Sequence, residues 1–419
     1  MTEQFPLPPT KILERLLVTD GLLMNADRWR IAHEYHRQRQ NIHYQSLNQP
    51  GIVSGLGVCL ISAPSEVPTN YRDRRWIQIQ PGIAIDLAGN PIIVPQPETY
   101  RIATQTQSET SLTVYLVISY VDPERLRRSA TADILHETFR IDEKLSPPGE
   151  TEVELCRILL PPGKVELENP ADVFFPGSNQ LDLRYRHQVR SRPQATVRVA
   201  QIANSAATER SAANLSYLLQ SVSGLYPALN AQQIEPINLE IKDINSQIKA
   251  CDLLFLAIRE AFSLNQEEFI GLKNYLDSGG VLLVDTSNDG DATISSILNL
   301  AQQLGHPIQD IKNMKLNHPL RTEPFSFAAL PSVNQEQIHL RYGGGIILVV
   351  GELSTAWGLD DELLLPRETI RTAQEMGINI LHFSWKRRQI MQLLGASDRI
   401  TASSVDSWIN QSAFDELNI

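Results

Sequence analysis

Three acidic side chains follow an apolar run in the segment VDTSNDGD. Asp285, Asp289 and Asp291 would stand at the carboxyl end of a strand, where open α/β sheets bind their ligands. Three carboxylates at such a place could hold Mg²⁺ or Ca²⁺, which prefer oxygen ligands. The alternative is a solvated strand-to-helix loop in which Asp and Asn residues cap the next helix, and we favour this alternative.

Three histidines form a second, weaker candidate metal site. His33, His36 and His43 share one face of a helix predicted over residues 26–49, with Asn25 as its N-cap. Imidazoles spaced three apart can chelate a transition metal. Arginines surround this set with positive charge, however, and carboxylates are few. A polar helix that packs against a neighbouring subunit is the better interpretation.

The sequence lacks the motifs that carry common enzyme chemistry. It has neither G-x-C-x-G nor G-x-S-x-G, the strained turn that exposes a nucleophile. Cys251 begins an apolar run instead of following one, and the glycine run 343–345 precedes a predicted strand, so it does not form a phosphate loop. We therefore predict no catalytic residues, no cofactor and no enzymatic activity.

These residues must be positioned by two different kinds of structure. In the N-terminal part, Ile77, Ile79, Ile83 and Ile85 alternate with less apolar residues, which predicts one face of a half-buried extended chain. A turn at residues 87–90 then leads into a short returning strand. These patterns predict an N-terminal helix and a small antiparallel β domain.

The C-terminal part alternates apolar strands with amphipathic helices. The strands are predicted at residues 197–204, 251–258, 281–286 and 346–351. Between the second and third, a helix with Ser263 and Gln266 as a capping box is stopped by Gly279-Gly280. Such alternation predicts a flavodoxin-like α/β domain, a parallel sheet with helices on both faces.

These signatures divide the chain into four parts. We predict a helix plus β-rich docking module at 1–165, a linker with a partly ordered arm at 166–194, the α/β domain at 195–394 and a tail at 395–419. In the linker, five basic residues would meet an acidic surface of the same assembly; these are Arg184, Arg186, His187, Arg190 and Arg192.

The tail begins with GASDRITASS, which is small and polar and predicts a flexible tether. Trp408, Ile409 and Phe414 would then form the apolar side of a short docking helix. Such a helix is marginal alone in water and needs another surface. The partner is either another subunit or the protein's own N-terminal module.

The composition of the chain limits which binding partners and which cellular compartment are expected. The formal net charge of −11 argues against sequence-independent nucleic-acid binding. No apolar run reaches the length that spans a bilayer, so direct membrane insertion is not expected. The three cysteines are isolated in apolar runs, which favours a reducing, cytoplasmic location.

Two parts of the chain resemble known families. The wording GIVSGLGV followed by IQPGIAIDLAGNPIIV, with YLVISYVDPE, ETFRID and VELCRILL further on, resembles a module of baseplate and tail-fibre-attachment proteins of contractile, phage-tail-like injection systems. A generic β-sandwich is the alternative. LLFLAIREAFSLNQEEFIGLKNYLDSGGVLLVDTSN, with HPLR and MGINILHFSWKRRQIMQLL, resembles an uncharacterised bacterial family related to class I glutamine amidotransferases.

The first resemblance implies a non-enzymatic structural subunit, associated with the particle and bound to other baseplate or tail components. Two alternatives remain. One is a hydrolase or amidotransferase relative that uses the aspartate cluster, and the other is a ligand-binding sensor that uses the same crevice.

Overall fold

The computed structural model describes residues 12–105, 110–123, 134–163, 166–202, 208–237, 248, 250–288, 291–358 and 364–403. The chain divides into two compact units, Met1–Arg192 and Pro193–Ile419, and each has its own apolar core.

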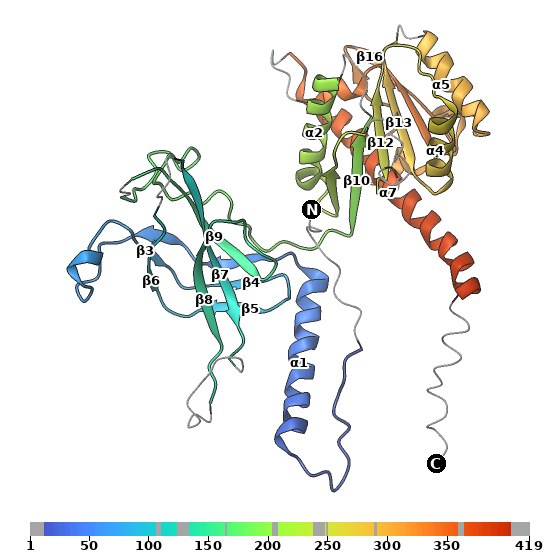
Figure 1. Ribbon diagram of the computed structural model, residues 1–419. Helices are drawn as coiled ribbons and strands as arrows, with labels where there is room; N and C mark the ends of the chain where they lie inside the picture. Colours follow the sequence, from blue (N-terminus) through green and yellow to red (C-terminus); the bar gives the residue numbers. More distant parts are fainter. Residues whose placement is uncertain are drawn as a thin grey trace. The chain divides into compact units, whose positions relative to one another are not determined.

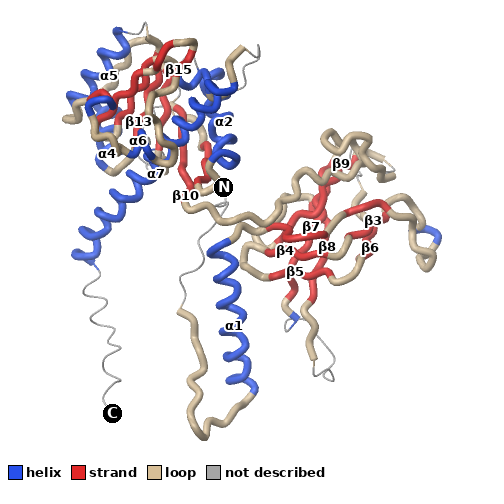
Figure 2. The backbone as a smooth tube through the Cα atoms, turned by 180° about the vertical axis from the view of Figure 1, so that it is seen from behind, coloured by secondary structure: helices blue, strands red, loops and turns tan. Residues whose placement is uncertain are grey.

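Unit 1 combines one long helix, α1 (Ala26–Leu47), with three small antiparallel sheets (Figures 1 and 2). The sheets have the orders β1-β4-β5, β2-β3-β6 and β8-β7-β9. Their strands are β1 (Gly51–Gly55), β2 (Val58–Leu60), β3 (Trp76–Ile79), β4 (Gly82–Ile85), β5 (Pro91–Val94), β6 (Glu98–Arg101), β7 (Leu112–Val121), β8 (Thr138–Lys144) and β9 (Glu152–Leu160), with a 3₁₀ turn η1 (Thr69–Tyr71).

The predicted helix start and hairpin turn are both confirmed. The side chain of Asn25 accepts from the backbone N–H of Arg28 at 2.9 Å, which satisfies one free donor of the first turn of α1. Between β4 and β5, Gly89 has a φ of 80°. The carboxylate of Asp86 accepts from the backbone N–H of Asn90 at 2.8 Å and closes the turn.

The single extended face predicted through Ile77 and Ile85 is wrong. The segment is two strands, β3 and β4, that belong to different sheets. The chain leaves β3 after Ile79 and enters β4 at Gly82, so the alternation changes phase at Gln80-Pro81. As a result Ile83 is exposed, whereas Ala84 is fully buried.

The linker predicted at 166–194 is also wrong, because most of it packs on unit 1. Leu167 and Leu181 are buried in the same core as the strands. Their backbone neighbours form bridges to β9 and to each other, Arg157 with Asp182 and Glu168 with Gln180. The density of Pro, Asn and Asp marks an irregular path along the surface, and two leucines are enough to hold it there.

Unit 2 has a seven-stranded sheet in the order β11-β10-β12-β13-β18-β17-β14. The first five strands in this order are parallel. At one edge, β17 pairs antiparallel with β18, and β14 pairs antiparallel with β17. The strands are β10 (Ala195–Gln201), β11 (Leu229–Gln233), β12 (Leu253–Ala257), β13 (Val281–Thr286), β14 (Gln309–Asp310), β17 (His339–Gly343) and β18 (Ile346–Val350), with a separate hairpin of β15 (Ser332–Val333) and β16 (Glu336–Gln337).

Helices cover both faces of this sheet (Figure 1). Helices α2 and α7 share one core with alternate strand residues, and α4 and α5 share the other. The helical segments are α2 (Thr208–Leu225), α4 (Gln266–Asp277), α5 (Asp291–Gln303), α6 (Pro319–Thr322), α7 (Arg367–Ser403) and the 3₁₀ turns η3 (Ile311–Asn313) and η4 (Leu353–Ala356).

The four strands predicted from the sequence are parallel, as expected, but the sheet as a whole is mixed, because β17 pairs antiparallel with β18. The glycine run before β18 closes a hairpin with β17, since Gly344 and Gly345 have φ of 56° and 96°. The predicted glycine stop of α4 is confirmed, with a φ of 97° at Gly279. Its capping box, however, is formed by Asn265 and Glu268 and not by Ser263 and Gln266.

Helix α7 continues past the predicted domain end at residue 394, and its backbone is helical to Ser403. The tether predicted from Gly395 is thus wrong for its first nine residues. A helix already fixed by buried residues such as Met376 and Leu381 extends without a new nucleus, and a single glycine costs only about 1 kcal/mol. Trp408, Ile409 and Phe414 lie outside the described residues.

Candidate functional site

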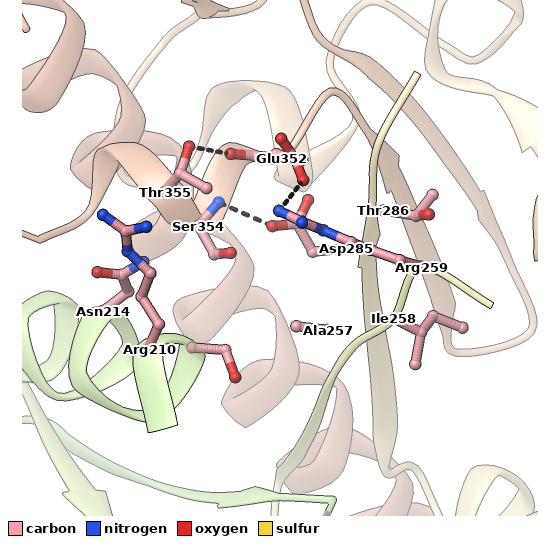
Figure 3. Close-up of a pocket in the computed structure, with 11 residues that line it drawn as sticks. Arg210, Asn214, Ala257, Ile258, Arg259, Asp285, Thr286, Glu352, Ser354 and Thr355 are labelled. Carbon is pink, nitrogen blue, oxygen red and sulfur yellow. Dashed lines mark hydrogen bonds and ion pairs between the residues drawn. The ribbon is translucent and has the colours of Figure 1, made fainter. Parts of the chain in front are cut away.

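The strand order of unit 2 creates a crevice at one end of the parallel strands. The chain passes from β10 through α2 to β11 on one side, and then returns to β12 on the other side of β10. Ligands of open α/β sheets bind at such a reversal, outside the carboxyl ends of the strands. A cavity of about 230 Å³ lies here (Figure 3). Its lining is Arg210, Ser211, Asn214, Ala257, Ile258, Arg259, Asp285, Thr286, Glu352, Ser354 and Thr355.

Asp285 stands near the end of β13 and is almost fully buried. Its two carboxylate oxygens accept from the backbone N–H groups of Leu353 at 3.1 Å and Ser354 at 2.8 Å. These donors open the 3₁₀ turn η4, so Asp285 acts as a cap for that turn. Burial disfavours the charged form and raises the pKa of the carboxyl to about 6, although these hydrogen bonds oppose the shift.

The candidate aspartate cluster, which the sequence analysis disfavoured, is not assembled in the described part of the chain. Asp291 is the first residue of α5, is exposed and is absent from the cavity lining. Asp289 lies outside the described residues. Within those residues, no group of three or more His, Cys, Asp and Glu side chains could hold a metal ion. Asp285 has a structural role that the sequence motif did not reveal.

Two arginines face the crevice, and the sequence analysis missed both. Arg259 follows the end of β12 and pairs with Glu352 at 2.7 Å. Arg210 lies in the first turn of α2. Figure 3 shows both side chains at the cavity, with Asn214 beside Arg210. The position of Arg259, directly after an apolar strand, is the signal that could have identified it.

The three histidines of α1 are exposed and are not part of a metal group in the described structure. Each packs edge-on against an aromatic neighbour of its own helix. The ring centroids are 5.2 Å apart for His33 and Trp29, and 5.3 Å apart for His36 and Tyr35. His33 and His36 also line a depression of unit 1, but His43 is not part of it.

The basic residues predicted to meet an acidic partner are partly used inside unit 1. Arg186 donates to the backbone carbonyls of Gly55, Leu56 and Leu155. Arg184 is paired with the carboxylate of Asp182 at 2.8 Å. The prediction is wrong for these two, because a segment without regular strands needs side-chain donors to satisfy nearby carbonyls.

No helix in the described part of the chain is long and apolar enough to cross a membrane.

Residues 195–384 match a family described as a domain of unknown function (DUF4159). The match covers most of the segment that resembles an uncharacterised bacterial family in sequence. It does not test the relation to glutamine amidotransferases. No curated protein matches the chain.

Two solved structures show weak similarity. For the crystal structure of TssK, the identity is 14% over 35% of this chain and 38% of that chain, with a TM-score of 0.24. For the mmIFT52 N-terminal domain, the identity is 15% over 45% of this chain and 97% of that domain, with a TM-score of 0.27. Both TM-scores are far below 0.5, so we draw no functional conclusion from either similarity.

Proposed function

We propose that this protein is a non-enzymatic docking subunit of a contractile, phage-tail-like injection system, in its baseplate or fibre-attachment region. The assignment to such a particle is supported by the sequence resemblance of the N-terminal module. The docking role is supported by one observation on unit 1, the exposure of residues 12–47. This arm–helix segment consists of residues 12–25, which form neither helix nor strand, and helix α1.

This arm–helix segment is poorly covered by the rest of unit 1. Helix α1 has 22 residues, and none of them is buried. Large apolar side chains are exposed along both the arm and the helix; they are Ile12, Leu17, Val18, Leu23, Met24, Trp29, Ile31 and Leu47. An isolated helix is marginal in water, and helical stability in proteins comes mainly from packing of an apolar face. A neighbouring subunit would supply that packing.

The chemistry of the two buried cysteines argues against thiol catalysis at either of them. Burial raises the pKa of Cys251 and of Cys156 to about 12, so neither forms the thiolate that a nucleophile requires. Asp285 is held by two backbone N–H groups. Asp285, the carboxylate that the enzyme alternative would use, thus already has two structural partners.

The proposal also includes a fold class for unit 2 and a cellular location for the protein. The five parallel strands have the flavodoxin-like order when they are numbered along the chain, and we assign the domain to that class. We also place the protein in the cytoplasm, bound to the particle. All three cysteines are in the thiol form, as a reducing compartment would keep them.

The test is incorporation into particles from the producing organism. Wild-type protein should co-sediment with sheath-containing particles in a density gradient. The double substitution Trp29→Ser, Ile31→Ser should lower its amount per particle at least tenfold, with an unchanged melting temperature, because both side chains are exposed. Leu316→Ser removes an even more exposed apolar side chain from unit 2 and should have no effect.

If wild-type protein is absent from such particles, the proposal is refuted. If the double variant is incorporated normally, the arm–helix segment is not the docking element.

A ligand-binding sensor is a second candidate, supported by the cavity at the strand ends. Its lining contains the side chains of Arg210, Asn214 and Arg259, which suit a polar or anionic ligand. Titration calorimetry with a panel of nucleotides, sugar phosphates and carboxylic acids tests it. Binding that is lost in Arg210→Gln supports this function, and no binding by any member of the panel argues against it.

A further inference from the structure

Unit 1 displays three consecutive apolar side chains on one loop after β9. The exposed fractions are 63% for Val173, 70% for Phe174 and 79% for Phe175. We call Val173–Phe175 the apolar knob. Single exposed apolar residues are normal on protein surfaces, but a contiguous exposed group marks an interaction site.

The backbone of the knob is fixed by local hydrogen bonds. The side-chain carboxylate of Asp172 accepts from the backbone N–H of Phe174 at 2.8 Å. The backbone carbonyl of Asp172 accepts from the backbone N–H of Phe175 at 3.1 Å. From the other side, Nη1 of Arg184 donates to the carbonyl of Phe174 at 2.8 Å. The two phenylalanines are therefore presented by a defined turn.

That turn is anchored to the core of unit 1. Arg184 is held by two hydrogen bonds to the carboxylate of Asp182, at 3.0 and 2.8 Å. The backbone of Asp182 pairs with Arg157 of β9 through two bonds of 2.9 Å. The guanidinium of Arg157 also lies 3.6 Å from the ring centre of Tyr185. The neighbouring Leu181 is buried in the core.

A rigid, exposed aromatic pair is well suited to specific protein binding. Phenylalanine has few side-chain rotamers, and a turn that is already ordered loses little further entropy on association. Aromatic anchors of this kind fill pockets at the centres of interfaces and carry much of the binding energy. The structure maintains this arrangement although it leaves apolar surface in water.

The charges next to the knob limit what it can bind. Asp172, directly before the knob, and Glu168, four residues earlier in the chain, carry exposed carboxylates. The cation of Arg184 is paired with Asp182. Such a surface is repelled by anionic lipid headgroups, which attract basic clusters. It complements a protein pocket with a positively charged rim.

We propose that the apolar knob inserts Phe174 and Phe175 into an apolar pocket, rimmed by basic side chains, on a different protein. Only the identity of that protein as a component of the injection particle rests on the proposed function. The insertion itself follows from the geometry and charge of the loop.

The test begins with full-length protein that carries the photo-cross-linker p-benzoylphenylalanine in place of Phe175, produced in its own organism. Irradiation should attach one protein, which mass spectrometry identifies. That protein is then purified, and its Kd is measured for wild-type chain, Phe174→Ser and the exposed control Leu316→Ser. Melting temperatures of both variants should equal that of wild type, because both positions are exposed.

Phe174→Ser should raise the Kd roughly 30-fold or more, the hot-spot threshold of about 2 kcal/mol at 1.4 kcal/mol per tenfold change. Leu316→Ser should change it less than threefold. Glu168→Lys should also weaken binding, with an effect that shrinks at high salt. A Kd unaffected by Phe174→Ser overturns the inference.

Cross-links only to a second copy, only to unit 2 of the same chain, only to lipid, or to nothing also overturn it. If the attached protein meets the affinity criteria but is not part of a sheath-containing particle, the knob inference stands and the proposed function fails.

Discussion

Replacement of Asp285 tests how the turn after β18 is held. The carboxylate is buried and caps η4 through the backbone N–H groups of Leu353 and Ser354. In Asp285→Asn, the amide oxygen can keep one of these bonds, but the NH₂ group cannot accept the other. In Asp285→Ala both bonds are lost. Each buried N–H left without an acceptor costs about 1–3 kcal/mol of stability.

The buried carboxylate of the wild type also has a pH-dependent cost, which the neutral variants do not have. Because the pKa of Asp285 rises from 3.8 to about 6 on folding, the folded state binds more protons than the unfolded state between these values. Stability of the wild type therefore falls as pH rises through this window and levels off above it. The full penalty corresponds to about 3 kcal/mol, of which about 2 kcal/mol develops between pH 4.5 and 7.5.

A neutral residue at position 285 does not have the free-energy cost of burying an ionised carboxylate. Asp285→Asn should be up to about 2 kcal/mol less stable than wild type at pH 4.5, and as stable or up to about 2 kcal/mol more stable at pH 7.5. Asp285→Ala should show the same pH dependence, lowered throughout by one further lost hydrogen bond. The comparison separates the burial of charge from the capping bonds.

The assay is urea unfolding at both pH values, followed by tryptophan fluorescence and circular dichroism. Thr286→Val is the matched control, since it changes the next residue of β13 without altering any ionisable group. Its hydroxyl is buried without a hydrogen-bond partner in the described structure, so this change should be neutral or slightly stabilising at both pH values. If Asp285→Asn differs from wild type by the same amount at pH 4.5 and 7.5, the buried carboxylate carries no such penalty and our reasoning is refuted.

Three further predictions concern packing and reactivity. Gly280→Ala should lower stability by about 3 kcal/mol or more, because an added Cβ would lie 2.2 Å from the ring of Tyr275; a melting curve close to wild type would contradict this. Arg186→Met should destabilise unit 1 by about 2–4 kcal/mol, since three backbone carbonyls lose their donor, and hydrogen exchange should show the loss in unit 1 alone. Cys251 should react with a thiol reagent at pH 8 only on unfolding, given its burial and its pKa of about 12; rapid labelling of folded protein would be the contrary result.

The sequence predicted best where local pattern and tertiary packing agree. The apolar run of β13 is buried at every residue, and the helix before it stops at Gly279 with a positive φ, as a glycine pair indicates. Asn25 caps α1 because its side-chain acceptor suits that position in any context. Such signals depend on neighbours along the chain and need no knowledge of distant partners.

The failures occur where distant contacts decide the outcome. Ile83 is exposed and Ala84 is buried, the reverse of the expected pattern. The reason is that β4 pairs with β1 and β5, whereas β3 belongs to a different sheet. In the crevice, the sequence placed Asp285 correctly at a strand end, but the capping of η4 depends on a turn 68 residues further along the chain. Arg259 was overlooked because its partner, Glu352, follows a different strand.

Helix α7 has a mechanical consequence. It is 37 residues long, or about 55 Å. A Cβ added at Gly279 would lie 2.7 Å from Cβ of Met391, so α7 runs close to the loop after α4 at this point. Twelve residues of helical backbone follow Met391 to Ser403. These twelve residues extend the helix by about 18 Å beyond Met391. A sideways displacement of about 3 Å at Ser403 would tilt a rigid extension of this length by about 10°. Movement at the C-terminal end would thus reach the domain as a torque on α7.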